Sequence, residues 1–181
     1  LKPHQINQTG VSRVFQTPEI FDDMTLLENV TIPALAKRDG SFRLNAWKAV
    51  RGETEIHEAA HECLADVGLA EKSQELARQL SRGDKRRLEL AMCLVQDPKL
   101  LLLDEPTAGM SRADTDNTID LMRRIADQGV TMVVIEHDMH VVFSLAEKIS
   151  VLAQGTVIAE DVPERIKGDA RVQEAYLGGA H

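Results

Sequence analysis

The stretch LLLLDEPTAGM, from Leu100 to Met110, runs four leucines directly into two adjacent carboxylates and a proline. Such a near-continuous apolar run is typical of a strand buried in a parallel sheet. Ligands of open parallel sheets gather at the carboxyl ends of the strands, where Asp104 and Glu105 stand. One acid there can hold Mg²⁺ while the next orients and deprotonates an attacking water, as phosphoryl transfer requires. For this stretch alone, a strand that ends in solvated acids is the alternative.

Downstream of Pro98 the hydrophobic pattern alternates between strand and helix periods. An alternation of buried strands and helices is typical of an α/β core, with a parallel sheet covered on both faces. We expect a short helical tail over PERIKGDARVQEAYLGG. Before that tail we expect the strand LLLLD, a helix from about Arg112 to Asp127, the strand TMVVIE, a helix from about Met139 to Ala146, and the hairpin ISVLAQGTVIAED turned at Gly155.

Upstream of that core the pattern is mostly helical. A short strand, GVSRVF, is expected to end on Gln16. From Thr25 to about Cys93 the apolar spacing predicts amphipathic helices, with one face formed by Trp47, Val50, Ala60, Leu64 and Val67. The predicted organisation is a partial α/β core over residues 1–24, an inserted helical subdomain over 25–93 and the remaining α/β core over 94–181.

Composition narrows the class of protein. The 181 residues carry a net charge of −8, which argues against a general nucleic-acid-binding surface, because phosphate neutralisation needs a basic excess. The two cysteines, Cys63 and Cys93, lie far apart in a chain without a signal-like apolar N-terminus, so we expect a reduced, cytosolic (cytoplasmic) compartment and propose no disulfide. Apolar runs are far shorter than the roughly 20 residues that span a bilayer, so any membrane role would come through a partner.

Four further residues have the chemistry of a phosphate site. Ser81 is a candidate N-cap, and Gly83 lets backbone N–H groups approach a ligand at a helix N-terminus, where phosphates bind favourably. His137 follows the strand TMVVIE at the same sheet edge as the acids and can contact a γ-phosphate or hold the attacking water. Gln16 ends the first strand in the same way and can bind metal or water through its amide oxygen. An ordinary capped helix and a structural histidine are the alternatives.

Together these residues resemble the nucleotide-binding subunits of ABC transporters. Five motifs occur in the family's order: VFQ with Gln16 looks like the Q-loop, LSRGD like the signature LSGGQ, LLLLDEP like the Walker B strand, AGMS like the D-loop, and His137 like the switch histidine. The match covers essentially the whole chain. FDDMTLLENV, IEHDMHVV and the closing EAYLGG are similar to importer subunits for branched-chain amino acids and related polar solutes.

The resemblance implies a P-loop NTPase-like ABC ATPase domain that hydrolyses ATP with Mg²⁺ between two subunits arranged head to tail. It implies that Ser81 and Gly83 reach the partner's γ-phosphate and that Glu105 is the general base. Asp104 and Gln16 would bind the metal, and Gln16 and His137 would sense the phosphate. The helical zone after Gln16 would dock on transmembrane permease subunits at the inner face of the cell membrane. A solute-binding protein would take part indirectly, and the second ATP-binding subunit is either identical or a paralogue.

The sequence also departs from the family's pattern. It contains no Gly-Lys dipeptide, so the phosphate-cradling loop G-x-x-x-x-G-K-[ST] is expected upstream of Leu1, and this chain alone is expected to bind ATP poorly. Arg82 and Asp84 replace a glycine and a glutamine of the signature. Ser111 stands where the D-loop usually has aspartate, and it can cap the next helix through Asp114. The carboxylate at position 84 repels a phosphate, a repulsion that neighbouring cations can offset unless they form a solvated face: Arg82, Lys85, Arg86 and Arg87.

Two other functions compete with transport. His57-Glu58-Ala59-Ala60-His61 fits H-E-x-x-H, the zinc-peptidase pattern of two ligands one helical turn apart with a glutamate base. No convincing third ligand follows it. Non-transport ABC ATPases that act on ribosomes or DNA share the fold, but they typically carry a second ATPase domain, long coiled-coil insertions or basic arms. A subunit that leaves catalysis to its partner is disfavoured, because both Glu105 and His137 are present.

Overall fold

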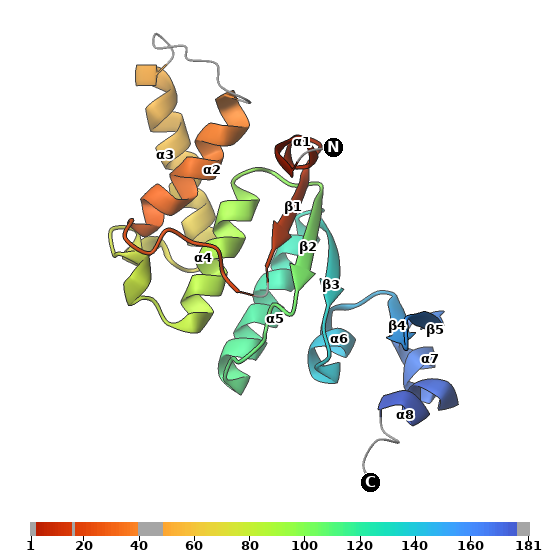
Figure 1. Cartoon of the computed structure of the whole chain (residues 1–181). Helices are drawn as coiled ribbons and strands as arrows, with labels where there is room; N and C mark the ends of the chain where they lie inside the picture. Colours follow the sequence, from red (N-terminus) through yellow and green to blue (C-terminus); the bar gives the residue numbers. More distant parts are fainter. Residues whose placement is uncertain (1–2, 16, 40–48, 177–181) are drawn as a thin grey trace. The chain divides into compact units, whose positions relative to one another are not determined.

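The structure, a computed structural model, describes residues 3–15, 17–39 and 49–176 (Figure 1). Contacts between residues divide the chain into two units, Leu1–Ile135 and Glu136–His181. The first unit contains a parallel sheet and a helical zone, and the second contains a β-hairpin with a small core of its own. The finer division of the sequence at residues 24 and 93 stays a prediction.

The sheet of the first unit is parallel, as the apolar runs predict. Its described strands are β1 (Val11–Val14), β2 (Leu100–Asp104) and β3 (Thr131–Ile135), hydrogen-bonded in the order β1-β2-β3 (Figure 1). The first strand is shorter than expected. It ends at Val14, because the next N–H, that of Phe15, donates to a glutamate on a helix instead of to a neighbouring strand.

The two faces of the sheet differ in burial, contrary to the expectation that both are covered. Leu101 and Leu103 of β2 are at most 1% exposed. On β3, by contrast, Val133 is 51% exposed and Ile135 is 61% exposed. Strands that read as continuously apolar are usually covered on both sides, but among the described residues this part of β3 is left open to solvent.

The predicted helical zone is confirmed for its described residues. It contains α2 (Leu26–Asp39), α3 (Ala49–Asp66) and α4 (Arg82–Leu94), which pack against one another. Thr25 and Glu28 form a reciprocal capping box at the start of α2. The Thr25 N–H donates to Glu28 Oε2 with an N···O distance of 2.8 Å, and the Glu28 N–H donates to Thr25 Oγ1 at 3.2 Å. Of the predicted apolar face, Ala60, Leu64 and Val67 are buried, while Trp47 lies outside the described residues and Val50 has no described side-chain surroundings. The other helices of the unit are α1 (Pro3–Gln8), η1 (Ala70–Lys72), η2 (Ala77–Gln79) and α5 (Arg112–Asp127).

The second unit matches the expected hairpin and helical tail. Strands β4 (Ile149–Ala153) and β5 (Thr156–Asp161) pair antiparallel, and Gly155 turns between them with φ +77°. Its buried core is apolar and draws on both strands and on the tail helices: Ile149, Val151, Ala159, Ile166 and Val172. The helices of this unit are α6 (Met139–Leu145), α7 (Pro163–Gly168) and α8 (Ala170–Tyr176).

No described helix is both long enough and apolar enough to cross a lipid bilayer.

Both cysteines are free thiols in the first unit, and their surroundings lower their reactivity. Burial raises the pKa of Cys63 to about 11 and that of Cys93 to about 12. The reactive thiolate is therefore scarce at pH 8. We expect Ellman's reagent to modify both thiols rapidly in denaturant and slowly in the native chain, with Cys93 the slower. Rapid native modification of Cys93 would contradict the burial described for α4.

Candidate phosphoryl-transfer site

The acid pair lies at the carboxyl end of β2, as predicted. Asp104 is the last residue of the strand and pairs in register with Ile135 of β3. Its Oδ2 accepts a hydrogen bond from Arg13 Nη2 at 3.0 Å, and both side chains remain partly exposed. A solvent-accessible ion pair contributes little free energy, so Asp104 can exchange this guanidinium for another cation.

Glu105 leaves the strand in an unusual backbone conformation. Its φ is +45°, which side chains with a Cβ adopt uncommonly. The surrounding main chain holds it there, because the Glu105 N–H donates to the Ile135 carbonyl at 2.9 Å and its own carbonyl accepts from Ala108 N–H at 3.1 Å. A sharp turn with a fixed backbone thus directs the half-buried Glu105 side chain.

The donor set fits a nucleotide-bound magnesium better than a protein cage. Mg²⁺ is usually held by one or two carboxylates together with phosphates and water. Asp104 supplies one carboxylate, whereas Gln16, the other predicted ligand, lies outside the described residues. In the described part of the chain, no three His, Cys, Asp or Glu side chains gather as a metal site.

Ser81 is the N-cap of α4, as predicted. Its φ and ψ of −62° and 162° are extended, and its Oγ accepts from the Asp84 N–H at 3.1 Å. Gly83 lies in the first turn, and a Cβ there would make only ordinary contact with Asp114, at 3.6 Å. Packing within the chain therefore does not require a glycine at position 83, so its small size is available to a ligand or a partner.

The charge of Asp84 is offset mainly by a residue that the sequence did not suggest. Lys72 Nζ donates to Asp84 Oδ2 at 2.7 Å, and this hydrogen bond raises the pKa of Lys72. Of the four cations expected to offset Asp84, Arg87 lies 3.6 Å from its carboxylate, while Lys85 pairs with Asp22 at 2.9 Å. The repulsion expected between this carboxylate and a phosphate is therefore reduced within the chain itself.

Arg82, which replaces a signature glycine, extends to the D-loop. The guanidinium lies so close to Gly109 that a Cβ there would collide with it, and Gly109 has φ +71°. Ser111 at the end of this loop caps α5, accepting from the Asp114 N–H at 3.2 Å, as the Ser-x-x-Asp pattern predicts. The signature and the D-loop are thus in contact within one chain.

Arg86 is neither a solvated cation nor a partner for Asp84, contrary to both alternatives from the sequence. It is 3% exposed and pairs with Glu89, which is 4% exposed, at 2.7 Å. Arg86 Nη1 also donates to the Phe15 carbonyl, and its Nη2 donates to the Glu105 carbonyl at 3.3 Å. The signal available in the sequence was Glu89 itself, a charge between the buried residues Leu88 and Leu90.

His137 follows β3 by two residues, as predicted, and belongs to the second unit. Its side chain is exposed, and its backbone N–H lies 3.2 Å from Glu136 Oε2. Asp138 caps α6 by accepting from the His140 N–H at 2.8 Å. The strand-end position of His137 agrees with the sequence, while its role stays a prediction.

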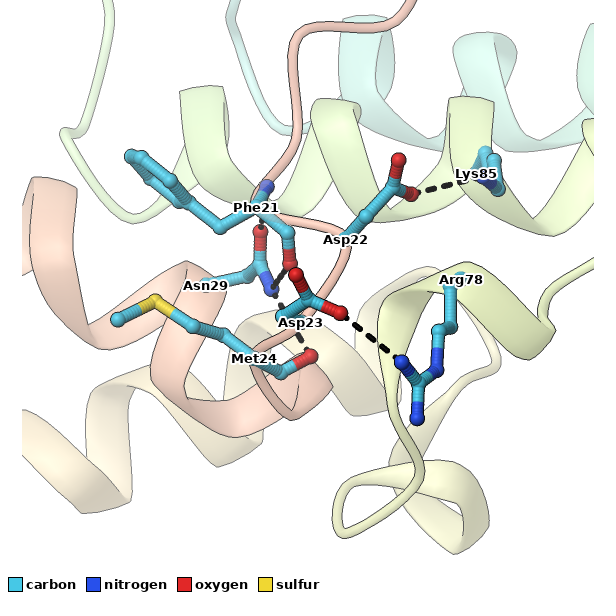
Figure 2. Close-up of polar contacts among 7 residues, drawn as sticks. All are labelled: Phe21, Asp22, Asp23, Met24, Asn29, Arg78 and Lys85. Atoms are coloured by element: carbon cyan, nitrogen blue, oxygen red, sulfur yellow. Dashed lines mark hydrogen bonds and ion pairs between the residues drawn. The ribbon is translucent and has the colours of Figure 1, made fainter.

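A loop of four residues, Phe21 to Met24, is fixed to the start of the signature region (Figure 2). The Asn29 side chain, on α2, forms hydrogen bonds with the loop backbone. Its Oδ1 accepts from the Phe21 N–H at 2.8 Å, and its Nδ2 donates to the carbonyl oxygens of Phe21 and Met24. Yet the Phe21 and Met24 side chains are 47% and 38% exposed. The two acids of the loop form ion pairs on either side of the signature: Asp22 pairs with Lys85 of α4, and Asp23 pairs with Arg78 of η2.

The H-E-x-x-H pattern falls on an exposed face of α3. His57, Glu58 and His61 are all exposed, and no third His, Cys, Asp or Glu joins them as a metal site among the described residues. Catalytic zinc needs three protein ligands and an open position. The described geometry therefore gives zinc chemistry no support.

Comparison with known proteins decides the family. The sequence pattern described as "ABC transporter" matches residues 2–108, more than half of the chain. The chain belongs to the ABC transporter ATP-binding family. A second pattern, "Branched-chain amino acid ATP-binding cassette transporter", matches residues 156–181 of this ABC protein.

Curated relatives of this ABC protein match it along nearly its full length. It is 36% identical to the high-affinity branched-chain amino acid transport ATP-binding protein BraF of Pseudomonas aeruginosa, over 99% of this chain and 72% of BraF. The same figures hold for LivG of Escherichia coli K12. A probable LivG of Archaeoglobus fulgidus is 33% identical over 97% of this chain and 68% of the relative.

Solved structures agree on the α/β fold. An ATP-binding cassette of an ABC transporter, MJ1267 in its ADP conformation, superposes with a TM-score of 0.81 at 30% identity, covering 98% of this chain and 72% of that one. A nucleotide-free ATP-binding cassette gives a TM-score of 0.78 at 26% identity, covering 97% and 72%. The predicted ABC ATPase fold is therefore confirmed.

Proposed function

We propose that this chain is part of the ATP-binding subunit of a transporter that takes up branched-chain amino acids or a related polar solute. The relatives named for branched-chain amino acid transport support the solute class, and so does the second family pattern at residues 156–181. No observation favours a ribosome- or DNA-directed ATPase, and the net charge of −8 weighs against one.

In this proposal ATP and Mg²⁺ bind between two ATP-binding subunits arranged head to tail. Asp104 holds Mg²⁺ and Glu105 is the general base that takes a proton from the attacking water. Ser81 and Gly83 bind the γ-phosphate held by the other subunit, whereas Gln16 and His137 sense the γ-phosphate held by their own subunit. The observation that carries this proposal is the fixed turn at Glu105, which follows Asp104 at the end of β2.

Turnover also needs a glycine-rich phosphate loop, G-x-x-x-x-G-K-[ST], which the 181 residues do not contain. The activity assays below therefore use this chain joined to such a loop, here termed the loop-containing subunit. Each variant is compared with the unsubstituted loop-containing subunit in the same preparation.

We further propose that the loop Phe21 to Met24 docks on a transmembrane permease subunit at the inner face of the cell membrane. An exposed aromatic and a methionine are typical of interface anchors. The ion pairs of Asp22 with Lys85 and Asp23 with Arg78 connect that loop to the segment on either side of Ser81 (Figure 2). Docking of the loop on a permease would thus be coupled to the position of the signature residues.

Copurification tests the proposed function. A tagged loop-containing subunit, expressed in its native host and extracted from membranes with mild detergent, is expected to carry permease subunits identifiable by mass spectrometry. Recovery with ribosomes or DNA, and without permease subunits, would instead support the non-transport ATPase.

Phe21→Ser tests the docking loop. Losing a central aromatic anchor typically costs about 2 kcal/mol or more, so the affinity for the permease should fall about 30-fold or more, measured by titration in detergent. Val157→Ser is the control, because Val157 is a similarly exposed apolar residue, 54% exposed, in the second unit. Equal losses for both variants would show that the effect is not specific to the loop.

A further inference from the structure

The buried pair Arg86 and Glu89 connects the signature helix to two other parts of the site. Arg86 Nη1 donates to Glu89 Oε2 at 2.7 Å and to the carbonyl of Phe15, the residue before Gln16. Arg86 Nη2 donates to the carbonyl of Glu105 at 3.3 Å. Glu89 Oε1 in turn accepts from the Phe15 N–H at 3.1 Å. One guanidinium thus joins α4, the end of β1 and the turn after β2.

Stability alone does not account for this pair. Both side chains are about 4% exposed, and removing two charges from water often costs as much as their attraction returns. Burial raises the pKa of Glu89, and its hydrogen bond from Phe15 and its pairing with Arg86 oppose that rise. Apolar side chains would fill the same space without this cost, so the polar contacts call for another explanation.

The Glu105 backbone is where the pair acts on the proposed chemistry. A φ of +45° is sparsely populated for a residue with a Cβ, and such conformations persist only where their surroundings hold them. The Ile135 carbonyl and the Ala108 N–H hold it from the sheet and from the turn itself. From α4, Arg86 Nη2 donates to the Glu105 carbonyl, which belongs to the peptide group that follows Glu105.

We propose that Arg86, oriented by Glu89, is a positioning residue that aligns Glu105 for proton transfer and makes this alignment depend on the position of the signature helix. Ser81 caps the same helix five residues earlier, so a displacement of α4 would move both Ser81 and Arg86. The inference rests on the proposed function, in which Glu105 is the general base and Ser81 meets the partner's nucleotide.

Arg86→Lys tests the inference most sharply. Lysine keeps the charge that pairs with Glu89, but a single ammonium lacks the planar fork that reaches two carbonyls and a carboxylate at once. In the loop-containing subunit, kcat should fall about 10- to 100-fold, as expected for a misaligned catalytic group, while KM for ATP changes less than about twofold. An unchanged kcat in a folded variant would overturn the inference.

A double-mutant cycle separates positioning from general destabilisation. If Arg86 acts through Glu105, Arg86→Lys should cost nothing further in a Glu105→Gln background. Additive losses would overturn the inference. Leu64→Val is the control for stability, because Leu64 is fully buried and lies on a different helix, α3. It should lower the melting temperature with kcat kept.

Hydrogen exchange on the 181-residue chain gives a readout independent of turnover. Arg86→Lys and Glu89→Gln should both speed exchange at the amides of Phe15 and Ala108. The Phe15 N–H donates to Glu89, and the Ala108 N–H donates to the Glu105 carbonyl that Arg86 also contacts. Unchanged exchange at both amides in both variants would overturn the inference. Full turnover by Glu105→Gln would instead refute the proposed function, so the two failures are distinguishable.

Discussion

Glu105→Gln is expected to lower kcat of the loop-containing subunit by about 10²- to 10⁴-fold, the usual contribution of a positioned general base. Glutamine has nearly the same shape and keeps the hydrogen-bonding oxygen, but it cannot accept the proton of the attacking water. The backbone contacts of Glu105 with Ile135 and Ala108 involve no side-chain atom and should survive the change. Nucleotide binding should therefore persist, measured as the Kd for a fluorescent ATP analogue.

Asp104→Asn distinguishes the two acids in the same assay. Because Asp104 is expected to hold Mg²⁺, this variant should raise the Mg²⁺ concentration needed for half-maximal turnover, whereas Glu105→Gln should leave that concentration unchanged. Undiminished turnover by Glu105→Gln would remove the general-base assignment. A shift in Mg²⁺ dependence for Glu105→Gln alone would exchange the roles of the two acids.

Ser81→Tyr is expected to lower turnover by at least about 10²-fold, comparable to the loss of one donor that stabilises transition-state charge. Tyrosine has no hydroxyl on Cβ, and its ring fills the space at the start of α4 that the proposal assigns to the partner's γ-phosphate. Binding of ATP to the variant's own phosphate loop should change little. Steady-state hydrolysis and nucleotide titration of the isolated subunit measure these two effects separately.

The control for Ser81 is a second helix cap. Ser81→Tyr also loses the cap hydrogen bond to the Asp84 N–H, which typically costs about 0.5–2 kcal/mol of stability. Thr25→Ala removes the equivalent bond to the Glu28 N–H at the start of α2, and it should reduce the melting temperature similarly while turnover is kept. If nucleotide binding by the isolated Ser81→Tyr subunit fell as far as its turnover, the role of Ser81 in the partner's site would be wrong.

Features set by local sequence could be predicted well. The four leucines before Asp104 indicated the strand β2. The serine before the helical pattern indicated the cap at Ser81, and the Ser-x-x-Asp spacing indicated the cap at Ser111; the structure confirms both caps. The bounds of α5 agree as well, because its apolar period and cap lie within one segment. Each of these signals depends on residues only a few positions apart.

Features set by distant contacts could not be predicted. The burial of Arg86 depends on Phe15, 71 residues earlier in the chain, and the spacing around Arg86 equally fits a solvated helix face. The pairing of Asp84 with Lys72 depends on the return of the chain through η1. The exposure of Val133 and Ile135 likewise depends on what packs over β3, which an apolar run does not specify.

In the proposed mechanism, the acids of this chain and its signature contact two different nucleotides. The most direct test is a structure of the Glu105→Gln loop-containing subunit with its partner subunit, ATP and Mg²⁺. We expect position 105 to face the γ-phosphate bound by its own subunit, while Ser81 and Gly83 contact the γ-phosphate bound by the other. Contact of position 105 and Ser81 with one and the same nucleotide, or a solvent-exposed Ser81 in the ATP-bound complex, would contradict it.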